Sequence, residues 1–419
     1  MSASLLSQLT PDGWLLLLTR YTRLFAYGAL SVVLVFHLTS LGLSAPQSGI
    51  LLTLTLAGDT AVSLFLTTRA DRIGRRRILI IGALLMAGAG LTFAFTDRIW
   101  LLVIAGTIGV ISPSGNDVGP FLPIEQAALA QVIPDRIRTN AFAWYTLAGS
   151  FATAAGSLCG GMLPHLIPGI PLNSAAGYRS VVVLYAAFGI FLAFLFTRLS
   201  GAAEIGGGDG GTDASLTTKT DIGIGPSRAI VLRLSALFAL DSFGGGFVLQ
   251  SFAAYWFYLR FGVDPGMLGA IFFGANVFAG VSALLASRLA SRFGLINTMV
   301  FTHLPSNILL ILVPLMPTLP LAIVVLLLRF SISQMDVPAR QSYVMAIVRP
   351  EERSAAAGIT GVARTIGASL PPLFVGLLFT QPALMNLPFF IAGTLKIVYD
   401  VCLYRGFVSL HPPTDRSQY

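Results

Sequence analysis

The chain has 419 residues, of which 55% are hydrophobic and only 11% are charged, and its mean hydropathy is +0.80. Soluble globular proteins carry about 25% charged residues, so this composition excludes an ordinary soluble domain. The formal net charge is +8, but the basic residues are scattered over loops between apolar stretches. They indicate membrane topology rather than nucleic-acid binding, for which we find no motif.

Hydropathy predicts twelve spans, because a membrane-spanning helix needs about 20 mostly apolar residues. The first six cover residues 13–41, 47–69, 77–96, 99–133, 139–164 and 179–198. The second six cover residues 229–260, 265–290, 295–317, 319–348, 354–379 and 384–405. We therefore predict an all-α membrane protein with two pseudo-symmetric six-helix halves, 1–200 and 229–419. The Gly-rich segment 201–228 between them is expected to be a flexible cytoplasmic linker.

Basic residues predict which side of the membrane each loop faces, because Lys and Arg are retained on the cytoplasmic side. They collect in the loops that join spans 2 to 3, 4 to 5, 6 to 7, 8 to 9 and 10 to 11, whereas the opposite loops offer only Arg98, Arg179 and Arg260. We expect a multi-pass protein of the cell's inner or plasma membrane with both termini in the cytoplasm. Residues 1–11 lack the features of a signal peptide, so the first span is expected to be retained.

The two halves can be superimposed in sequence with an offset of 220 residues. This offset places Gly42 on Gly262, Gly49 on Gly269, Arg72 on Arg292 and Gly74 on Gly294. Internal duplication of this kind is typical of secondary transporters. The repeat is predicted to run in parallel, because six spans return the chain to its starting side.

The loop after the second span contains Asp71, Arg72, Gly74, Arg75 and Arg76. This pattern resembles the signature of the major facilitator superfamily, and the resemblance covers essentially the whole chain. It departs at one position, because Thr67 stands where the family has a glycine. The resemblance implies transport by alternating access, with spans 1, 4, 7 and 10 lining a central cavity.

The resemblance also implies a conformational role for the Asp71 loop. In this family the aspartate is understood to cap span 11, here near Ser354, and to bond with a nearby arginine, here Arg136 or Arg138, which holds the outward-open state. The second copy of the loop has Ser291 in place of the aspartate, so a weaker lock is expected there. The alternative is that the basic loop is only a topology anchor.

A second resemblance lies in the fifth span, at Gly156-Ser157-Leu158-Cys159-Gly160-Gly161. This segment is similar to the Gly-Pro-x-x-Gly-Gly element of drug and proton antiporters, although the proline is missing. It favours export, but ordinary close packing of helices explains small residues equally well. Cys159 and Cys402 both lie in predicted spans, and we expect them to pack rather than to form a disulfide.

Charged residues inside spans are the candidates for mechanism, because a charge at the bilayer centre costs at least about 2.5 kcal/mol. The candidates for the substrate site are Arg23, Asp117, Glu125, Asp241, Asp336, Arg340 and Arg364. Asp117 and Glu125 are eight residues apart and Asp336 and Arg340 four apart, so each pair is expected to share a helix face. Matching depths predict two ion pairs between the halves, Glu125 with Arg340 and Arg23 with Asp241. The alternative is permanent pairs that fix helix register.

Other charges in the spans are weaker candidates. Asp59 is expected either to bind a proton or to have a buried structural partner. Lys396 and Asp400, four residues apart, are expected to satisfy one another. His37 and His303 lie near predicted span ends and are expected at the membrane interface. No metal-ligand spacing and no catalytic motif is evident, so we expect neither a metal nor a cofactor nor enzyme activity.

The sequence therefore predicts a secondary transporter that exports a small organic solute in exchange for protons. The candidates for proton coupling are Glu125, Asp241 and Asp59, because a carboxylate can carry a proton across a low-dielectric site. The arginines Arg23, Arg340 and Arg364 leave open a transporter of organic anions in either direction. A non-transporting membrane sensor, a folded partner of another membrane protein, and a membrane enzyme are further alternatives. We expect small-molecule, proton and lipid partners, no nucleic acid, and a monomer.

Overall fold

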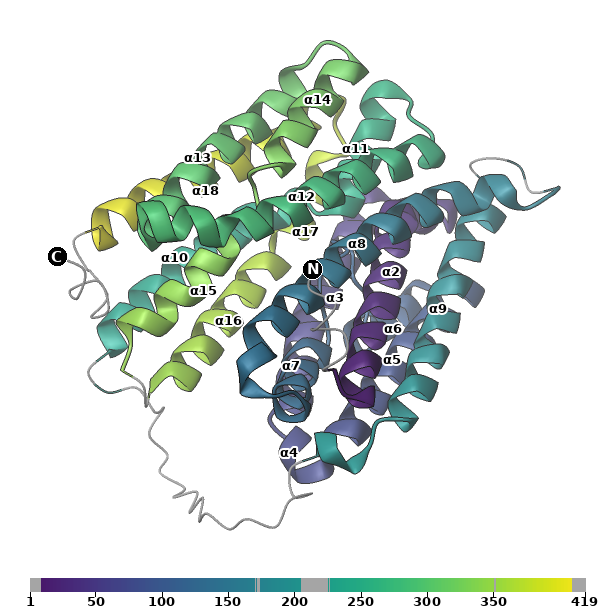
Figure 1. Cartoon of the computed structure of the whole chain (residues 1–419). Helices are drawn as coiled ribbons and strands as arrows, with labels where there is room; N and C mark the ends of the chain where they lie inside the picture. The colour runs from purple at the N-terminus through teal and green to yellow at the C-terminus, as the bar shows by residue number, and fades with distance from the viewer. Residues whose placement is uncertain are drawn as a thin grey trace. The chain divides into compact units, whose positions relative to one another are not determined.

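The computed structural model of the chain is a set of membrane-length helices, drawn in Figure 1. It describes residues 9–169, 171, 174–204, 225, 227–349 and 352–408, apart from the side chains of residues 71, 135–140 and 354. Within these ranges every regular element is a helix, and nine helical stretches are long and apolar enough to cross a membrane. The predicted all-α fold is confirmed.

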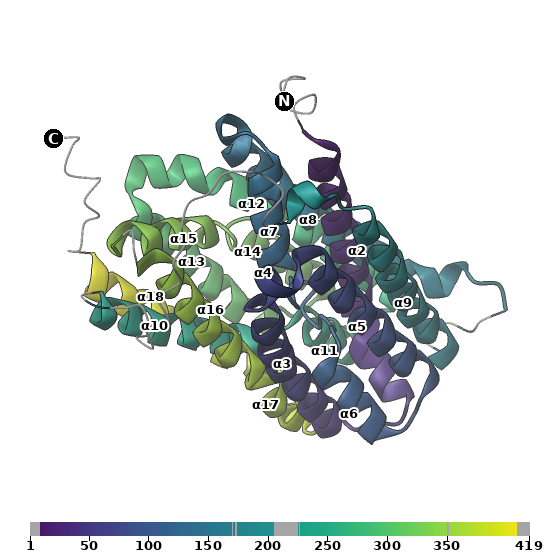
Figure 2. The same cartoon turned by 90° about the horizontal axis from the view of Figure 1, so that it is seen from below.

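The first six predicted spans correspond to seven long helices. These are α2 (Pro11–Ser40), α3 (Ala45–Thr67), α5 (Arg75–Phe95), α6 (Ile99–Ile108), α7 (Phe121–Val132), α8 (Asp135–Leu166) and α9 (Ala175–Thr197). The short helix α4 (Ala70–Ile73) forms the loop between α3 and α5. In Figure 1 α2 lies beside α8 and α9, and in Figure 2 α5 lies beside α9 and α3 beside α6.

The second six spans contain nine α-helices, because three of them are interrupted. These are α10 (Arg228–Gly246), α11 (Gln250–Phe261), α12 (Pro265–Phe293), α13 (Leu295–Leu312), α14 (Leu319–Phe330), α15 (Asp336–Ile347), α16 (Arg353–Ser369), α17 (Pro371–Leu378) and α18 (Leu387–Phe407). Three short 3₁₀ turns complete the described elements, at Gly201–Ala203, Val313–Leu315 and Pro382–Leu384.

The fourth span differs most from its prediction. We expected one helix over residues 99–133, but residues 109–120 are not helical and separate α6 from α7. Pro113 and Pro120 cannot donate a backbone hydrogen bond, and Gly115 and Gly119 adopt positive φ angles of 72° and 78°. The expectation was wrong because hydropathy measures the side chains and is blind to these backbone constraints.

The turns at equivalent places in the two halves confirm the 220-residue duplication. Gly74, before α5, has a φ of 105°, and Gly294, before α13, has a φ of 82°. Gly42 and Gly262 likewise have φ angles of 87° and 67°. Each position needs a left-handed backbone, which glycine adopts without steric penalty. The repeated glycines therefore preserve the same turn twice.

By their internal contacts, the residues form two compact units. The first comprises Met1–Gly207, Phe247–Gly280 and Pro372–Pro388, and the second comprises Gly208–Gly246, Val281–Pro371 and Phe389–Tyr419. The first unit thus takes in parts of spans 7, 8, 11 and 12. The sequence-based halves remain our proposal for the parts that move.

Two glycine crossings explain why the first unit includes those parts. They lie at the end of its helices that carries the loop Leu41–Ser44, which we call the Gly42 end. A Cβ added to Gly161 of α8 would lie 2.2 Å from the carbonyl oxygen of Pro265 and 2.8 Å from the Cα of Gly269 on α12. A Cβ added to Gly376 of α17 would lie 3.0 Å from the Cα of Gly49 on α3. Such backbone contact requires glycine.

The two described ends of the predicted linker are both tied to acidic side chains. Gly201–Ala203 is a 3₁₀ turn, and the Glu204 carboxylate accepts the N–H groups of Arg75 and Arg76 at 2.8 and 3.0 Å. Within the second unit, Glu352 accepts the N–H of Gly225. Three hydrogen bonds hold the pKa of Glu352 below its usual range: one from the hydroxyl of Ser227, one from the backbone N–H of Ser227 and one from the backbone N–H of Gly225. Residues 205–224 lie outside the described part of the chain.

Candidate functional site

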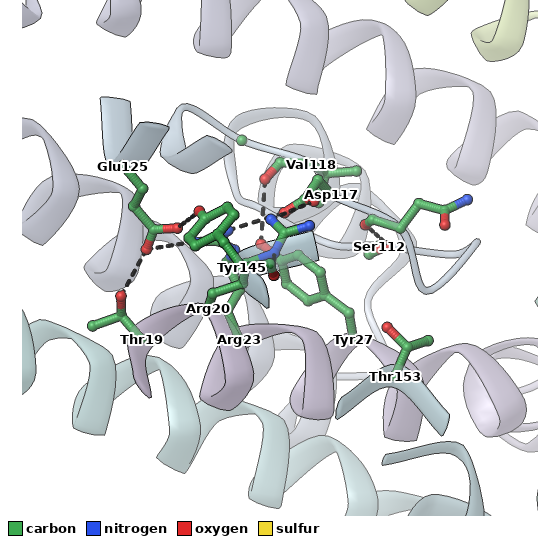
Figure 3. A network of polar contacts seen from close by, with 12 residues as sticks. Thr19, Arg20, Arg23, Tyr27, Ser112, Asp117, Val118, Glu125, Tyr145 and Thr153 are labelled. Atoms are coloured by element: carbon green, nitrogen blue, oxygen red, sulfur yellow. Dashed lines mark hydrogen bonds and ion pairs between the residues drawn. The ribbon is translucent and has the colours of Figure 1, made fainter. Parts of the chain in front are cut away.

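A buried ion-pair network is centred on Arg23 of α2, which Figure 3 shows beside two carboxylates. Its Nη2 lies 3.0 Å from Asp117 Oδ1, and its Nη1 lies 2.8 Å from Glu125 Oε1. The side chains of Arg23 and Glu125 are fully buried. The guanidinium also stacks 4.7 Å from the ring centroid of Phe121. Each charge is therefore compensated inside the first unit.

Three neighbouring side chains complete this network. Arg20 Nη1 lies 2.9 Å from Asp117 Oδ2, and Arg20 Nε donates to the carbonyl oxygen of Tyr145 at 2.8 Å. The Tyr145 hydroxyl and the Thr19 hydroxyl both donate to the Glu125 carboxylate, the latter at 2.9 Å. The network therefore connects α2, α7, α8 and the non-helical segment 109–120.

The backbone of the segment 109–120 is held by groups from other spans and by one serine of its own. A peptide group inside a membrane needs a hydrogen-bond partner, because no water is available to it. Six of the segment's carbonyl oxygens accept hydrogen bonds: Val110 from Tyr185, Pro113 from the N–H of Ser251, Gly115 from Thr153, Asn116 from Ser112, Val118 from Tyr27 and Gly119 from Ser63. These partners replace the ladder of a helix.

Asp59 of α3 holds the last part of this segment. Its Oδ1 accepts the N–H of Gly119 at 2.7 Å, and Ser63, one turn further along α3, donates to the carbonyl oxygen of Gly119 at 2.9 Å. Asp59 is 8% exposed. Within the part of the chain that the structure describes, no Lys, Arg or His forms an ion pair with it. Asp59 is thus a buried carboxylate held by a backbone amide.

A second buried network lies in the second unit, around Asp241 of α10. Its Oδ1 lies 2.6 Å from Lys396 Nζ, and its Oδ2 lies 3.1 Å from Arg340 Nη1. Arg340 Nη1 also lies 3.4 Å from Asp336 Oδ2, so these two residues share a face of α15 as predicted. All four side chains are at most 10% exposed.

The ion pairs predicted between the halves are wrong. Glu125 is paired with Arg23 and not with Arg340, and Asp241 is paired with Arg340 and not with Arg23. We matched these residues by depth, but depth does not fix the direction in which a side chain leaves its helix. Asp117 and Glu125 do meet the same arginine, although Asp117 lies in the non-helical segment rather than on a shared helix face.

Three weaker predictions are also corrected. Lys396 and Asp400 do not satisfy one another, because Lys396 contacts Asp241 and Asp400 contacts His303. His303 is only 5% exposed rather than interfacial, since its face of α13 is turned towards these carboxylates. His37 is fully buried, with Nε2 2.8 Å from the carbonyl oxygen of Phe93.

Arg364 of α16 differs from the other candidate arginines. Among the described residues no carboxylate lies within ion-pair distance of it, and its buried Nε has no hydrogen-bond partner. Arg23 and Arg340, in contrast, each contact two carboxylates.

The loop after α3 is only partly described. Gly74 provides the left-handed turn, Arg75 Nη1 donates to Gln131 Oε1 at 2.7 Å, and Arg76 Nη1 donates to the carbonyl oxygen of Leu199 at 3.3 Å. Arg72 is exposed. The side chains of Asp71, Arg136, Arg138 and Ser354 lie outside the described residues, so the implied lock stays a prediction.

Sequence reasoning missed several members of these networks. Arg20 is a charged residue of the first predicted span but was left out of the candidate site, although it precedes Arg23 by three residues and so shares its helix face. Tyr145 and Thr19 are uncharged and leave no signal that separates them from packing residues. Lys396 and Asp400 were recognised as buried charges but were assigned to each other.

Comparison with known proteins agrees with this architecture. The family model described as Major Facilitator Superfamily matches residues 16–372. An uncharacterized membrane protein of Saccharomyces cerevisiae, YJR124C, is 30% identical over 414 residues, 92% of each chain. A Na⁺, Li⁺, K⁺/H⁺ antiporter of Planococcus maritimus is 28% identical over 188 residues, 42% of each chain. The crystal structure of a bacterial homolog of the human lysosomal transporter Spinster, inward-facing and occupied, has a TM-score of 0.73 at 17% identity, covering 94% of this chain and 97% of that one.

These findings define the class of the protein as an integral, multi-pass secondary transporter rather than an enzyme. The chain belongs to the major facilitator superfamily.

Proposed function

We propose that the protein exports a small organic solute in exchange for protons, and that the six-helix halves 1–200 and 229–419 rock about a central site. Protons and the solute are its expected partners, and the bilayer of the inner or plasma membrane its location, with both termini in the cytoplasm and a monomeric state. The partial similarity to a proton-exchanging antiporter and the antiporter-like element at Gly156–Gly161 support this direction of transport.

The observation that carries the proposal is the environment of Asp59. A proton carrier must be stable both with and without its proton. Glu125 is paired with Arg23 and accepts hydrogen bonds from Thr19 and Tyr145, so its carboxylate oxygens are already occupied by partners. Asp59 accepts one backbone N–H and has no cationic partner among the described residues.

Asp241 is a poorer carrier for the same reason as Glu125. Lys396 and Arg340 each lie within 3.1 Å of its carboxylate. Protonation of Asp241 would leave two buried cations with one fewer counter-charge, which is strongly unfavourable. We therefore place Asp59 first among the three candidates, and assign Asp117, Glu125, Asp241, Asp336 and Arg340 mainly to positioning around the site.

The test uses purified protein in proteoliposomes that contain a pH-sensitive dye. Counterflow of a metabolite panel identifies the solute, and solute-driven proton flux then measures coupling. Asp59→Asn should lose proton flux but retain solute exchange, because exchange needs only the movement of the halves. The matched control is Asp97→Asn, which changes an exposed carboxylate in the loop before α6. Normal proton flux in Asp59→Asn would exclude Asp59 as the carrier, and absence of proton flux in the wild type would exclude antiport.

The Asp71 loop is part of the same proposal. We propose that Asp71 bonds with Arg136 or Arg138 and caps α16 near Ser354 in one state of the cycle, as the family resemblance implies. Asp71→Asn should then change the ratio of labelling from the two sides of the membrane while insertion stays normal. An unchanged ratio together with wild-type transport would reduce the loop to a topology anchor.

A second candidate function is transport of an organic anion, and Arg364 favours it. A half-buried arginine whose buried Nε has no hydrogen-bond partner, and which has no carboxylate partner among the described residues, is suited to an anionic substrate. Arg364→Gln should abolish counterflow of the anionic members of the panel and spare the cationic ones. Arg98→Gln, which changes an exposed arginine before α6, serves as the control. Equal loss for all solutes would assign Arg364 a structural role.

A further inference from the structure

A histidine lies between two carboxylates in the second unit, on the helix α13. His303 of α13 has its Nδ1 2.8 Å from Asp400 Oδ1 and its Nε2 3.6 Å from Asp241 Oδ1. Asn307, one turn along α13, donates to the other oxygen of Asp400 at 3.0 Å. The Tyr399 ring meets the imidazole edge to face, with ring centroids 5.8 Å apart. All of these groups are buried.

Each ring nitrogen of His303 therefore faces a carboxylate oxygen. Nδ1 also lies 3.1 Å from the side-chain amide nitrogen of Asn307, which can donate to it only while Nδ1 carries no proton. A neutral imidazole has only one N–H, so it can donate to only one of the two carboxylates. The charged imidazole has two N–H groups and can donate to both carboxylates. At 3.6 Å the contact with Asp241 is an ion-pair distance and not yet a hydrogen bond.

The charges of the surrounding helices favour an additional proton. The buried and half-buried ionisable side chains on the helices around His303 include Asp241 on α10, Arg329 on α14, Asp336 and Arg340 on α15, Arg364 on α16, and Lys396, Tyr399 and Asp400 on α18. Five of these residues are joined by ion pairs to one another or to His303. They are three carboxylates and two cations: Asp241, Asp336, Asp400, Arg340 and Lys396. This buried cluster thus has one negative charge in excess when His303 is neutral. A proton on His303 removes that excess.

We infer that His303 and Asp400 form a proton-binding site in the second half of the transporter, separate from Asp59. Lys396 Nζ lies 2.6 Å from the same oxygen of Asp241 that His303 faces. A charged His303 therefore competes with Lys396 for Asp241, whose other oxygen holds Arg340. A proton bound by His303 on α13 and Asp400 on α18 in this way changes the ion pairs of Asp241 on α10 and of Arg340 on α15.

The site itself is tested without any transport measurement. The chain has four histidines, so ¹⁵N-histidine NMR of the full-length protein in lipid can follow each imidazole between pH 5 and 8, and His303→Gln assigns the signal of His303. We expect that signal to show the charged form at pH 6, and Asp400→Asn to lower the ratio of charged to neutral His303 about tenfold through loss of one charge-assisted hydrogen bond. His37→Gln is the control, because His37 is a buried histidine bonded to a backbone carbonyl.

Two results would overturn the inference. One is a His303 signal that stays neutral from pH 5 to pH 8 in the wild type. The other is a charged signal that Asp400→Asn leaves unchanged, since the carboxylate would then have no part in proton binding. If His303→Gln does not fold, the signal of His303 is assigned as the one that persists when each of the other three histidines is changed to glutamine, and Asp400→Asn still gives this second answer.

The role of the site in transport rests on the proposed proton antiport and is measured separately. In proteoliposomes His303→Gln should lower the number of protons moved per solute while solute exchange persists, whereas His37→Gln should change neither. NMR protonation of His303 without any proton flux in the wild type would refute antiport and leave the binding site intact. Unchanged proton stoichiometry in His303→Gln would remove the site from the transport cycle.

Discussion

The crossing of α8 and α12 at Gly161 should be sensitive to a single methyl group. An alanine there would place its Cβ 2.2 Å from the carbonyl oxygen of Pro265. Ordinary van der Waals contact begins at 3.4 Å, so the helices would have to separate by roughly 1.2 Å, a strain of the size that overpacking creates, about 1–3 kcal/mol. We expect Gly161→Ala to shift the equilibrium between two conformations. The population of molecules whose Gly42 end is open, relative to that whose Gly42 end is packed, should rise by about 5- to 150-fold.

The assay is the labelling rate of a cysteine placed at Ser251. This serine at the start of α11 is fully buried, and its hydroxyl has no hydrogen-bond partner among the described residues. Cys159 and Cys402 are free thiols and are first replaced by serine. A membrane-impermeant maleimide should then label Ser251→Cys faster by the factor given above when Gly161→Ala is added.

The control for the added methyl group is Gly88→Ala on α5. A Cβ at Gly88 meets nothing within 4 Å, so this change should leave the labelling rate as it was. If Gly161→Ala also leaves the rate as it was, the α8 and α12 crossing does not hold the Gly42 end closed. If both variants raise the rate equally, the effect comes from alanine in a helix and not from the crossing.

Three further predictions concern stability, measured as thermal unfolding in detergent. Arg23→Met should destabilise the protein by about 3–5 kcal/mol, because it leaves the fully buried Glu125 without a cation, and Glu125→Gln should destabilise it less, because Arg23 keeps its contact with Asp117. The double variant should lose less than the sum of the two single variants; additive losses would contradict direct pairing. Glu204→Ala should lower the free energy of unfolding by about 0.5–2 kcal/mol, since two N–H groups at the start of α5 lose their acceptor. An unchanged melting temperature would show that water replaces the Glu204 carboxylate. Gly74→Ala should lower the free energy of unfolding by about 1–2 kcal/mol, because alanine is strained at a φ of 105°. Gly88→Ala should not have this effect, and equal losses in the two variants would refute the backbone argument.

The features that sequence could predict are those that one residue encodes by itself. Apolar length gave the spans, because each span must match the bilayer wherever it packs. Repeated glycines gave the duplication, and Gly74 and Gly294 indeed adopt the same left-handed turn. Charges in spans identified Arg23 and Glu125, since a buried charge has a high free-energy cost whatever its partner.

The features that sequence could not predict depend on direction and on the backbone. Hydropathy gives the depth of Arg23 but not the side of α2 from which it leaves, so its partner Glu125 was assigned to another arginine. The Tyr145 hydroxyl donates a hydrogen bond to that carboxylate, yet nothing in the sequence distinguishes this tyrosine from one that only packs inside a span. The interruption at residues 109–120 was missed because it depends on hydrogen bonds from spans distant in the chain.

The interrupted span also makes the network of Arg23 sensitive to very short changes of length. A helical residue advances about 1.5 Å and turns by about 100°, whereas an extended residue advances about 3.3 Å. Pro120 is already in the helical region, so further growth of α7 would next include Gly119, which would exchange its φ of 78° for a helical φ of about −60° and so redirect the chain towards Asp117. Asp117 reaches Arg20 and Arg23 at 2.9 and 3.0 Å, so it could not keep both contacts. Rewinding a single peptide beside Gly119, where Asp59 is bonded, would therefore be enough to separate a carboxylate from two arginines.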